Sequence, residues 1–281
     1  MEVIRAKSDL ALALKNRRFL RMEVGFVPTM GALHEGHASL IRRAKKEVSF
    51  VVLSIFVNPT QFTDSGDFNS YPSTLASDLE LAREEGVDLV FVPQAEDVYD
   101  GGAHAKRMDY GRLTSAFEGR KRPGHFDGVI EVVRRLFNIV QPSSSFFGEK
   151  DLQQLQVIRH LGKAEFPSMK IVGCGLIRDA DGLAMSSRNI RIREGFRDHA
   201  LKINSCLLEA KNAIAAGLRV EEALALQRLI LEDEPHVELE YFAAVDPDTF
   251  EEYVGQETEG RPFLIVAAVV SGVRLIDNCL L

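Results

Sequence analysis

Short apolar runs alternate with helix-like stretches through the first 176 residues of the chain. Val24 to Pro28 and Leu89 to Val92 are typical of strands that are buried on both faces of a sheet. Between them, Leu40, Ile41 and Ala44 recur at helical spacing. The same alternation predicts further strands at 50–57, 145–147 and 170–173, and helices at 37–48, 75–85, 129–140 and 152–161. Such alternation favours an α/β fold in which a parallel sheet carries helices on both faces.

The pattern changes after about Ile177. Two helix-like stretches follow at 197–216 and 220–232, and then three strand-like runs without helices between them, at 237–245, 263–270 and 273–276. Consecutive strands beside paired helices are typical of an α+β arrangement. The sequence therefore predicts a larger α/β domain at residues 1–176 and a smaller C-terminal α+β domain at residues 177–281.

Composition narrows the classes of function. The chain has 281 residues, of which 46% are hydrophobic and 27% charged, as in ordinary soluble globular proteins. The formal net charge of −7 argues against broad nucleic-acid binding, which normally needs a basic face. Three cysteines without metal-type spacing indicate a reducing compartment, and neither a signal core nor an apolar run of membrane-spanning length is visible. We therefore expect a cytoplasmic protein that binds neither nucleic acid nor a membrane.

A first candidate site is the segment VPTMGALHEGH, from Val27 to His37, between a predicted strand and the following helix. Ligands of open α/β sheets bind at the carboxyl ends of strands, and a helix N-terminus offers N–H groups to phosphates. Gly31 and Gly36 permit a tight turn and the close approach of a ligand. His34 and His37 share a face on a helical turn because they are three residues apart. The alternatives are structural histidines or a zinc site, although the spacing is not the HExxH of zinc proteases.

Four further stretches carry polar side chains near predicted strand ends. Lys150, in FGEKD, lies where a phosphate contact would be expected, whereas the alternatives are a surface lysine and a helix cap at Asp151. Arg188, in LAMSSRN, combines with hydroxyl groups either to bind phosphate oxygens or to form an ordinary loop. Gln61, in FVNPTQF, needs a partner from the protein or a ligand if it is buried. The segment RPGHFDG at 122–128 precedes a helix and fits simple turn chemistry as well.

Taken together, these stretches resemble the pantothenate synthetase family, a member of the wider nucleotidyltransferase group with class I aminoacyl-tRNA synthetase-like folds. The matching segments are PTMGALHEGH, FVNPTQF, RPGHFDGV, FGEKDLQQL, LAMSSRN and RLIDN. They follow one another in order over nearly the whole chain. A single histidine motif is a weak signal, whereas six ordered motifs are specific.

The resemblance implies a Rossmann-like ATP-binding domain, a lid-like second domain and a homodimer. It implies ATP with Mg²⁺, pantoate and β-alanine as substrates, and it names no protein ligand for the metal. It implies that His37 is catalytic, together with His34 and Lys150. The residues implied to bind ATP are Met30, Gly31, Ala32, Leu33, His34, Glu35, Gly36, His37, Gly148, Glu149, Lys150, Asp151, Ile177, Met185, Ser186, Ser187 and Arg188. Those implied to hold pantoate are Gln61 and Gln154, with Asn58, Arg122 and His125 lining the same region.

The implied reaction has two steps. The pantoate carboxylate attacks the α-phosphorus of ATP and releases pyrophosphate, and the β-alanine amine then displaces AMP from pantoyl adenylate. Because such an adenylate is easily hydrolysed, a loop from Thr63 to Pro72 is expected to close over it, and the second domain is another candidate gate. The chain departs from the family here, with Thr63 for the usual glycine and Ser73 for the usual arginine. These departures leave the conformation of the loop open.

Other readings of the residues remain. A nucleotidyltransferase that adenylylates a phosphate ester would share the histidine motif but lack the paired glutamines. A class I aminoacyl-tRNA synthetase fits less well, because no basic RNA-binding extension is visible. A catalytically silent nucleotide-binding regulator would show no pyrophosphate exchange that depends on pantoate.

Overall fold

The structure is a computed structural model that describes residues 1–20, 22–62, 65–99, 101–255 and 261–281. Thr63, one of the two predicted departures from the family, lies outside these ranges. The chain divides into two compact units. The N-terminal unit contains Met1–Glu149 and Gln154–Gly175, and the C-terminal unit contains Lys150–Gln153 and Leu176–Leu281.

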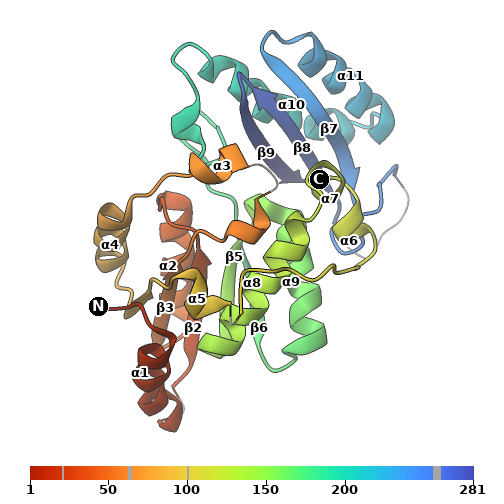
Figure 1. The fold of residues 1–281 in the computed structure, drawn as a ribbon. Coiled ribbons are helices and arrows are strands. Elements are labelled where there is room, and N and C mark those ends of the chain that lie inside the picture. The colour runs from red at the N-terminus through yellow and green to blue at the C-terminus, as the bar shows by residue number, and fades with distance from the viewer. Residues whose placement is uncertain (21, 63–64, 100, 256–260) are drawn as a thin grey trace. The chain divides into compact units, whose positions relative to one another are not determined.

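A parallel sheet of six strands forms the centre of the N-terminal unit, in the order β1-β4-β3-β2-β5-β6. Figure 1 shows β3, β2, β5 and β6 side by side in that order. The strands are β1 (Glu2–Ile4), β2 (Val24–Thr29), β3 (Phe50–Ile55), β4 (Leu89–Phe91), β5 (Ser144–Gly148) and β6 (Lys170–Cys174). This sheet confirms the predicted fold class.

Helices cover both faces of the sheet because neighbouring residues of each strand point to opposite sides. Val27 packs with Ile41 of α2 (Glu35–Glu47) in one apolar cluster. Its neighbour Phe26 meets Phe137 of α8 (His125–Val140), with the ring centroids 6.4 Å apart. The other long helices of this unit are α1 (Lys7–Phe19), α4 (Leu75–Glu84) and α9 (Leu152–Glu165).

Short helical segments occupy the connections. They are η1 (Pro59–Gln61), α3 (Ser65–Asn69), α5 (Ala95–Val98), α6 (Arg112–Ser115), α7 (Glu118–Lys121) and η2 (Glu149–Asp151). Part of the predicted gate loop therefore forms a helical turn, α3. Phe62 packs against Phe68 and Tyr71 of this region, with ring centroids 5.3 and 5.8 Å apart.

The strand order reverses beside β2. The chain passes from β2 to β3 and β4 on one side, whereas β5 and β6 lie on the other side. The connections that follow β2 and β5 therefore diverge from a common carboxyl edge. A crevice at such a reversal is the usual ligand site of open α/β sheets.

The C-terminal unit is an antiparallel sheet with two long helices. The sheet has the order β7-β8-β9, formed by β7 (Val237–Val245), β8 (Phe263–Val270) and β9 (Val273–Leu280). The helices α10 (Arg197–Ala215) and α11 (Val220–Asp233) bury Leu207 and Leu224 in a cluster with Leu264 and Val266 of β8. A short segment, η3 (Asn189–Arg191), precedes them. This arrangement confirms the predicted α+β character.

Several predicted boundaries were wrong. The strand predicted to reach Val57 ends at Ile55, because Asn58 begins the turn of η1 by accepting the N–H of Thr60. The helix predicted from Val129 begins at His125, and the last strand runs four residues beyond Ile276. β1 and α1 were not predicted, because β1 has three residues at the sheet edge and, among the described side chains of α1, only Leu10 and Leu14 are buried.

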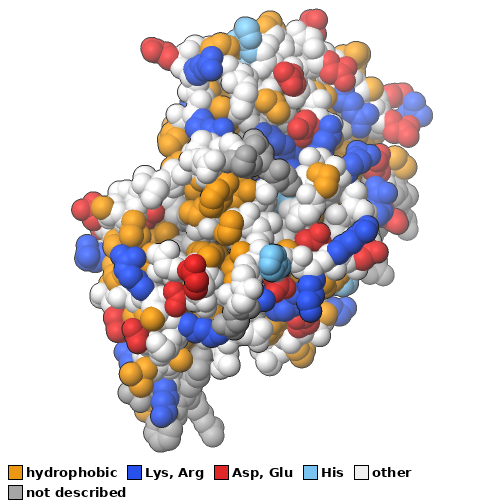
Figure 2. Space-filling model, in the orientation of Figure 1, with side chains coloured by type: hydrophobic (Ala, Val, Ile, Leu, Met, Phe, Trp, Pro, Cys, Tyr) orange, Lys and Arg blue, Asp and Glu red, His pale blue; other side chains and the backbone are white. Residues whose placement is uncertain are grey.

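Charges on the surface are mixed in sign. On the face that Figure 2 shows, Lys and Arg side chains are interspersed with Asp and Glu rather than gathered in one basic patch. Within the described ranges, every helix is too short or too polar to cross a membrane.

Candidate active site

The loop that follows β2 is held by a buried carboxylate from another helix. Asp78 of α4 accepts the backbone N–H groups of Ala32 at 3.0 Å and Leu33 at 2.8 Å, and the hydroxyl group of Thr74 at 3.1 Å. Gly31 and Ala32 have positive φ angles of 83° and 49°. A Cβ on Gly31 would lie 2.9 Å from the Asp78 carboxylate, so glycine is required by both conformation and space. This anchor fixes the path of the chain from Met30 to α2.

His34 and His37 cap the N-terminus of α2 for each other. The Nδ1 atom of His34 accepts the N–H of Gly36 at 3.1 Å, and Nδ1 of His37 accepts the N–H of His34 at 3.3 Å. The two ring centroids are 4.2 Å apart. Because a neutral imidazole whose Nδ1 is an acceptor carries its proton on Nε2, both rings have Nε2 as a donor. The sequence predicted that the rings share a face, but not that they form the cap.

Glu35, in the first turn of α2, pairs with Arg42 two turns further along the helix. Its carboxylate oxygens accept from the two terminal nitrogens of Arg42 at 2.6 and 2.9 Å, and Arg42 also binds Glu85. The hydrogen bond from Arg42 lowers the pKa of Glu35. The structure therefore gives the Glu35 side chain a partner within the protein.

Gln61, Asn58 and Met30 meet beside this loop. Gln61 is almost buried, accepts from Nδ2 of Asn58 at 3.1 Å, and brings its own Nε2 within 3.0 Å of the Met30 sulfur. Asn58 also donates to the carbonyl group of Gly128 at 3.2 Å. A Cβ on Gly128 would overlap the carbonyl of Thr60, so glycine allows α8 to approach η1.

His125 and Arg122 support the same cluster from the start of α8. Nδ1 of His125 lies 2.7 Å from the backbone oxygen of Gln61, and its Nε2 lies 3.0 Å from Nη1 of Arg122. Since the guanidinium can only donate, Nε2 accepts and Nδ1–H donates to Gln61. Through this bond, the buried His125 ring holds the backbone of Gln61, the candidate substrate residue.

The carboxyl end of β5 contributes Gly148, Glu149 and Gln154. Gly148 ends the strand, and a Cβ there would meet no described atom within 4 Å. Glu149 starts η2, and Gln154 lies half-buried in the first turn of α9. Open space above Gly148 leaves room for a ligand at this edge of the sheet.

The C-terminal unit carries the predicted nucleotide residues from Ile177 onward in one folded loop. The carbonyl of Ile177 accepts the N–H of Met185 at 3.0 Å, so these two residues are neighbours. The hydroxyl of Ser186 accepts the N–H of Arg188 at 3.2 Å, and Asn189 donates to the carbonyl of Ala184 at 3.0 Å. The residues Met185, Ser186, Ser187 and Arg188 are all half-buried.

The RLIDN segment explains why Lys150 belongs to the C-terminal unit. Asn278 donates to the carbonyl of Lys150 at 3.0 Å. Asp277, which is buried, binds Arg178 through two hydrogen bonds of 2.7 and 2.9 Å. Burial raises the pKa of Asp277, against the opposing effect of Arg178. Asp151 follows in η2 and lies 3.6 Å from the Lys150 ammonium group.

Sequence reasoning missed Asp78, Tyr99 and Arg178. Asp78 had a signal, since it shares the apolar stripe of α4 with Leu79 and Ala82, where a carboxylate needs partners. Tyr99 and Arg178 had none, because their partners Asn58 and Asp277 lie 41 and 99 residues away in sequence.

Comparison with known proteins gives a consistent result. The family model described as pantoate-beta-alanine ligase matches residues 2–280. The pantothenate synthetase of Aquifex aeolicus is 43% identical over 275 residues, which cover 96% of this chain and 95% of the relative. That of Bacteroides thetaiotaomicron is 41% identical and covers 99% and 98% of the two chains.

Comparison with solved structures leads to the same family as the sequence matches. The crystal structure of pantothenate synthetase from Thermus thermophilus superposes with a TM-score of 0.92 at 40% identity, covering 99% of each chain. The pantoate-beta-alanine ligase of Francisella tularensis, complexed with beta-gamma ATP and β-alanine, gives a TM-score of 0.82 at 33% identity, covering 100% of this chain and 97% of that one. Both the match along the whole sequence and the fold show that the chain belongs to the pantoate–β-alanine ligase family, a family of enzymes.

Proposed function

We propose that the chain joins pantoate and β-alanine in two steps that are driven by ATP. A carboxylate oxygen of pantoate attacks the α-phosphorus, and the bond from that phosphorus to the bridging oxygen breaks, releasing pyrophosphate. The amine of β-alanine then attacks the acyl carbon of pantoyl adenylate, loses a proton and expels AMP. The products are pantothenate, AMP and pyrophosphate.

The observation that carries this proposal is the paired histidine cap at the switch point of the sheet. A helix N-terminus favours phosphate, and His34 and His37 add Nε2 donors at the same place. Fixed donors that face a developing phosphate charge lower the barrier without having to reorganise. We assign His37 the main catalytic role, with His34 beside it.

The remaining candidates fall into two groups. Gln61 follows β3 and Gln154 follows β5, so both come after the carboxyl end of a strand. These two residues are proposed to hold pantoate, while Met30 and Phe62 cover its methyl groups. Lys150 and Arg188 of the C-terminal unit are proposed to supply positive charge to the triphosphate, and the backbone near Ile177 to bind adenine. Arginine and lysine differ here, since only the guanidinium forms a planar fork to phosphate.

Mg²⁺ is proposed to enter as the counter-ion of ATP. It commonly keeps several waters and binds through substrate phosphates with few protein ligands. Within the described part of the chain, no group of three or more His, Cys, Asp and Glu side chains is placed to hold a metal ion. We assign no residue of the chain to it.

The family resemblance also supports a homodimer and a cytoplasmic location. Light scattering coupled to size exclusion would test the first: a mass of one 31.3 kDa chain at micromolar concentration would contradict it.

The deciding experiment follows the nucleotide product while pantoate and β-alanine are omitted in turn. With both present, AMP and pyrophosphate should form in equal amounts. With pantoate alone, labelled pyrophosphate should exchange into ATP, because the first step is reversible on the enzyme. Stoichiometric ADP and phosphate, or exchange without pantoate, would contradict the mechanism.

A further inference from the structure

The Asn58 side chain has one possible amide orientation. Its Oδ1 accepts the backbone N–H of Thr60 at 3.3 Å, and its Nδ2 donates to the backbone carbonyl of Gly128 at 3.2 Å. A backbone N–H only donates and a carbonyl only accepts, so exchanging the two amide atoms would create two repulsive contacts. Asn58 is 1% exposed, and both its polar atoms are used within the protein.

The orientation of Gln61 follows from that of Asn58. Nδ2 of Asn58 lies 3.1 Å from the Gln61 amide, and because Nδ2 can only donate, the atom that it meets is the acceptor Oε1. Nε2 of Gln61 is thereby directed away, and its protein neighbour is the Met30 sulfur, which is only a weak acceptor. Gln61 can therefore offer a ligand N–H donors, while its oxygen is directed at Asn58.

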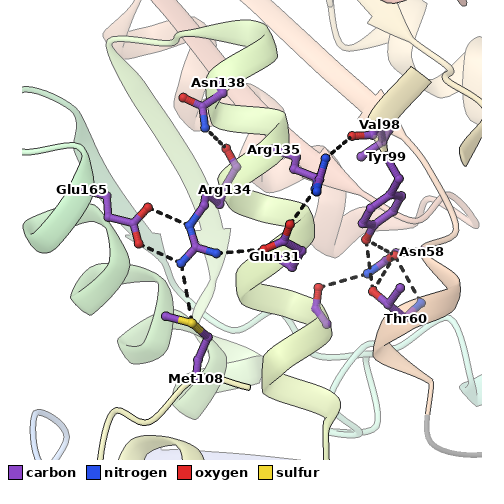
Figure 3. A network of polar contacts seen from close by, with 11 residues as sticks. Asn58, Thr60, Val98, Tyr99, Met108, Glu131, Arg134, Arg135, Asn138 and Glu165 are labelled. Atoms are coloured by element: carbon purple, nitrogen blue, oxygen red, sulfur yellow. Dashed lines mark hydrogen bonds and ion pairs between the residues drawn. The ribbon is translucent and has the colours of Figure 1, made fainter. Parts of the chain in front are cut away.

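The Tyr99 hydroxyl group supplies the shortest bond to Asn58. It donates to Oδ1 at 2.6 Å and lies 3.1 Å from the Thr60 hydroxyl. Tyr99 is 2% exposed, and burial raises the pKa of its hydroxyl, which therefore stays protonated and able to donate at neutral pH. Figure 3 shows the ring directed at Asn58 and Thr60.

Tyr99 is itself held from α8. The Arg135 guanidinium lies over the ring at 5.0 Å from its centroid and donates to the Val98 carbonyl at 3.3 Å. Buried Glu131 accepts from Arg135 at 2.7 Å and from Arg134 at 2.9 Å. The network in Figure 3 therefore joins an ion-pair cluster of α8 to the Asn58 amide.

We propose that Tyr99 is a positioning residue for substrate selection, which holds the Asn58 amide in place so that Gln61 keeps its donor directed toward the substrate. This inference rests on the proposed binding of pantoate at Gln61. A donor selects an acceptor, so the group of pantoate that meets Gln61 is a carboxylate oxygen or a hydroxyl lone pair. Asn58 is then a positioning residue as well, rather than a substrate contact.

The test is Tyr99→Phe, which removes the hydroxyl and keeps the ring under Arg135. Pantoate binding should weaken about two- to tenfold, the value of one neutral hydrogen bond, while the Kd for ATP stays unchanged. In a Gln61→Ala background, Tyr99→Phe should change pantoate binding by less than about twofold, because the residue through which it acts is gone. Thr60→Val, which removes the neighbouring hydroxyl, serves as a second variant should Tyr99→Phe fold poorly.

The inference that Gln61 acts as a donor toward the substrate has a test of its own. Gln61→Glu keeps an acceptor toward Asn58 but presents a second acceptor to the substrate, so it should bind pantoate more weakly than Gln61→Ala does. Tyr110→Phe is the matched control, since this hydroxyl interacts with Arg134 at the other end of the network. It should leave the Kd for pantoate unchanged.

The outcomes separate this inference from the proposed function. If the wild-type protein neither binds pantoate nor supports exchange that depends on it, the proposed function fails. If the wild type does both, but Tyr99→Phe binds pantoate normally or acts additively with Gln61→Ala, the positioning role fails alone. Equal losses for ATP and pantoate would mean a general structural role and would also overturn it.

Discussion

At the scale of single residues, the two histidines of the α2 cap serve the backbone and the proposed chemistry with different atoms. Nδ1 of each ring satisfies an N–H group at the helix start, and Nε2 remains the donor. The use of Nδ1 fixes the ring orientation. Preorganisation of this kind is what a donor needs to act mainly in the transition state.

His37→Ala is therefore expected to lower kcat on the order of a hundredfold or more, while the Kd for ATP changes far less. The same change removes a cap bond and should cost about 1 kcal/mol of unfolding free energy. Single-turnover formation of AMP, ATP titration and urea unfolding measure the three effects.

The control is His37→Gln, since glutamine at this position of a capping box can accept the N–H of His34. It should recover most of the lost stability without recovering the rate. A variant at position 37 that is folded and turns over at the wild-type rate would contradict the catalytic assignment.

The three cysteines are expected to be inert in the native protein. Burial raises the pKa values of Cys174, Cys206 and Cys279 to about 11, so little reactive thiolate exists at pH 8. Ellman's reagent should label the native enzyme slowly, with no early loss of activity, and should label all three thiols after unfolding.

The same raised pKa values determine how the stability of the protein changes with pH. Because the folded thiols hold their protons more tightly than the unfolded ones, the free energy of unfolding should fall as pH rises from about 9 to about 11. In the labelling experiment, rapid reaction of the native protein with Ellman's reagent at pH 8 would show that a thiol is less buried than described.

At the scale of elements, the loop between β2 and α2 depends on a carboxylate from α4. Asp78→Asn keeps the shape but places an amide N–H₂ against a backbone N–H of Ala32 or Leu33. We expect a loss of about 1–3 kcal/mol in unfolding free energy, together with weaker ATP binding, because the loop leads into the capped helix. Urea denaturation and ATP titration measure both.

Asp9→Asn makes the same chemical change at an exposed carboxylate of α1. It should alter stability by no more than about 0.5 kcal/mol. If Asp78→Asn behaves like this control, Asp78 does not anchor the loop.

Elements with many buried residues were predictable from the sequence, whereas elements with few buried residues were not. The apolar run of β3 is buried at all six positions, so its pattern is complete in the sequence. Among the described side chains of α1, only Leu10 and Leu14 are buried, and three-residue β1 gains its structure from pairing with β4. Such elements are stabilised by neighbours, which a local pattern does not record.

At the scale of the whole molecule, Lys150 to Gln153 belong to the C-terminal unit although the chain on both sides belongs to the N-terminal unit. The Asn278 contact to the Lys150 carbonyl accounts for this. The proposed cation of the triphosphate site is therefore fixed by β9 of the C-terminal sheet.

Lys150→Ala should slow adenylate formation on the order of a hundredfold, since a fixed cation stabilises the negative charge that develops on phosphate in the transition state. Pantoate-dependent pyrophosphate exchange measures this step. Supplied with preformed pantoyl adenylate, the variant should acylate β-alanine at nearly the wild-type rate.

Lys163→Ala, at an exposed lysine near the end of α9, is the matched control and should leave both steps intact. Equal losses in the two half-reactions of Lys150→Ala would show that Lys150 is not specific to the first.

The sequence by itself determined the α/β core, the α+β second half and the family, because long apolar strands, periodic helices and six ordered motifs are local properties of the chain. It also singled out His34, His37 and Gln61. The tertiary structure decided how these residues are oriented: Asp78 anchors the loop, the histidines cap each other, and Asn58 sets the direction of the Gln61 amide. A hydrogen bond depends on the position and direction of both partners, which folding sets even for His34 and His37, three residues apart. Partners such as Ala32 and Asp78, 46 residues apart, are brought together only by folding.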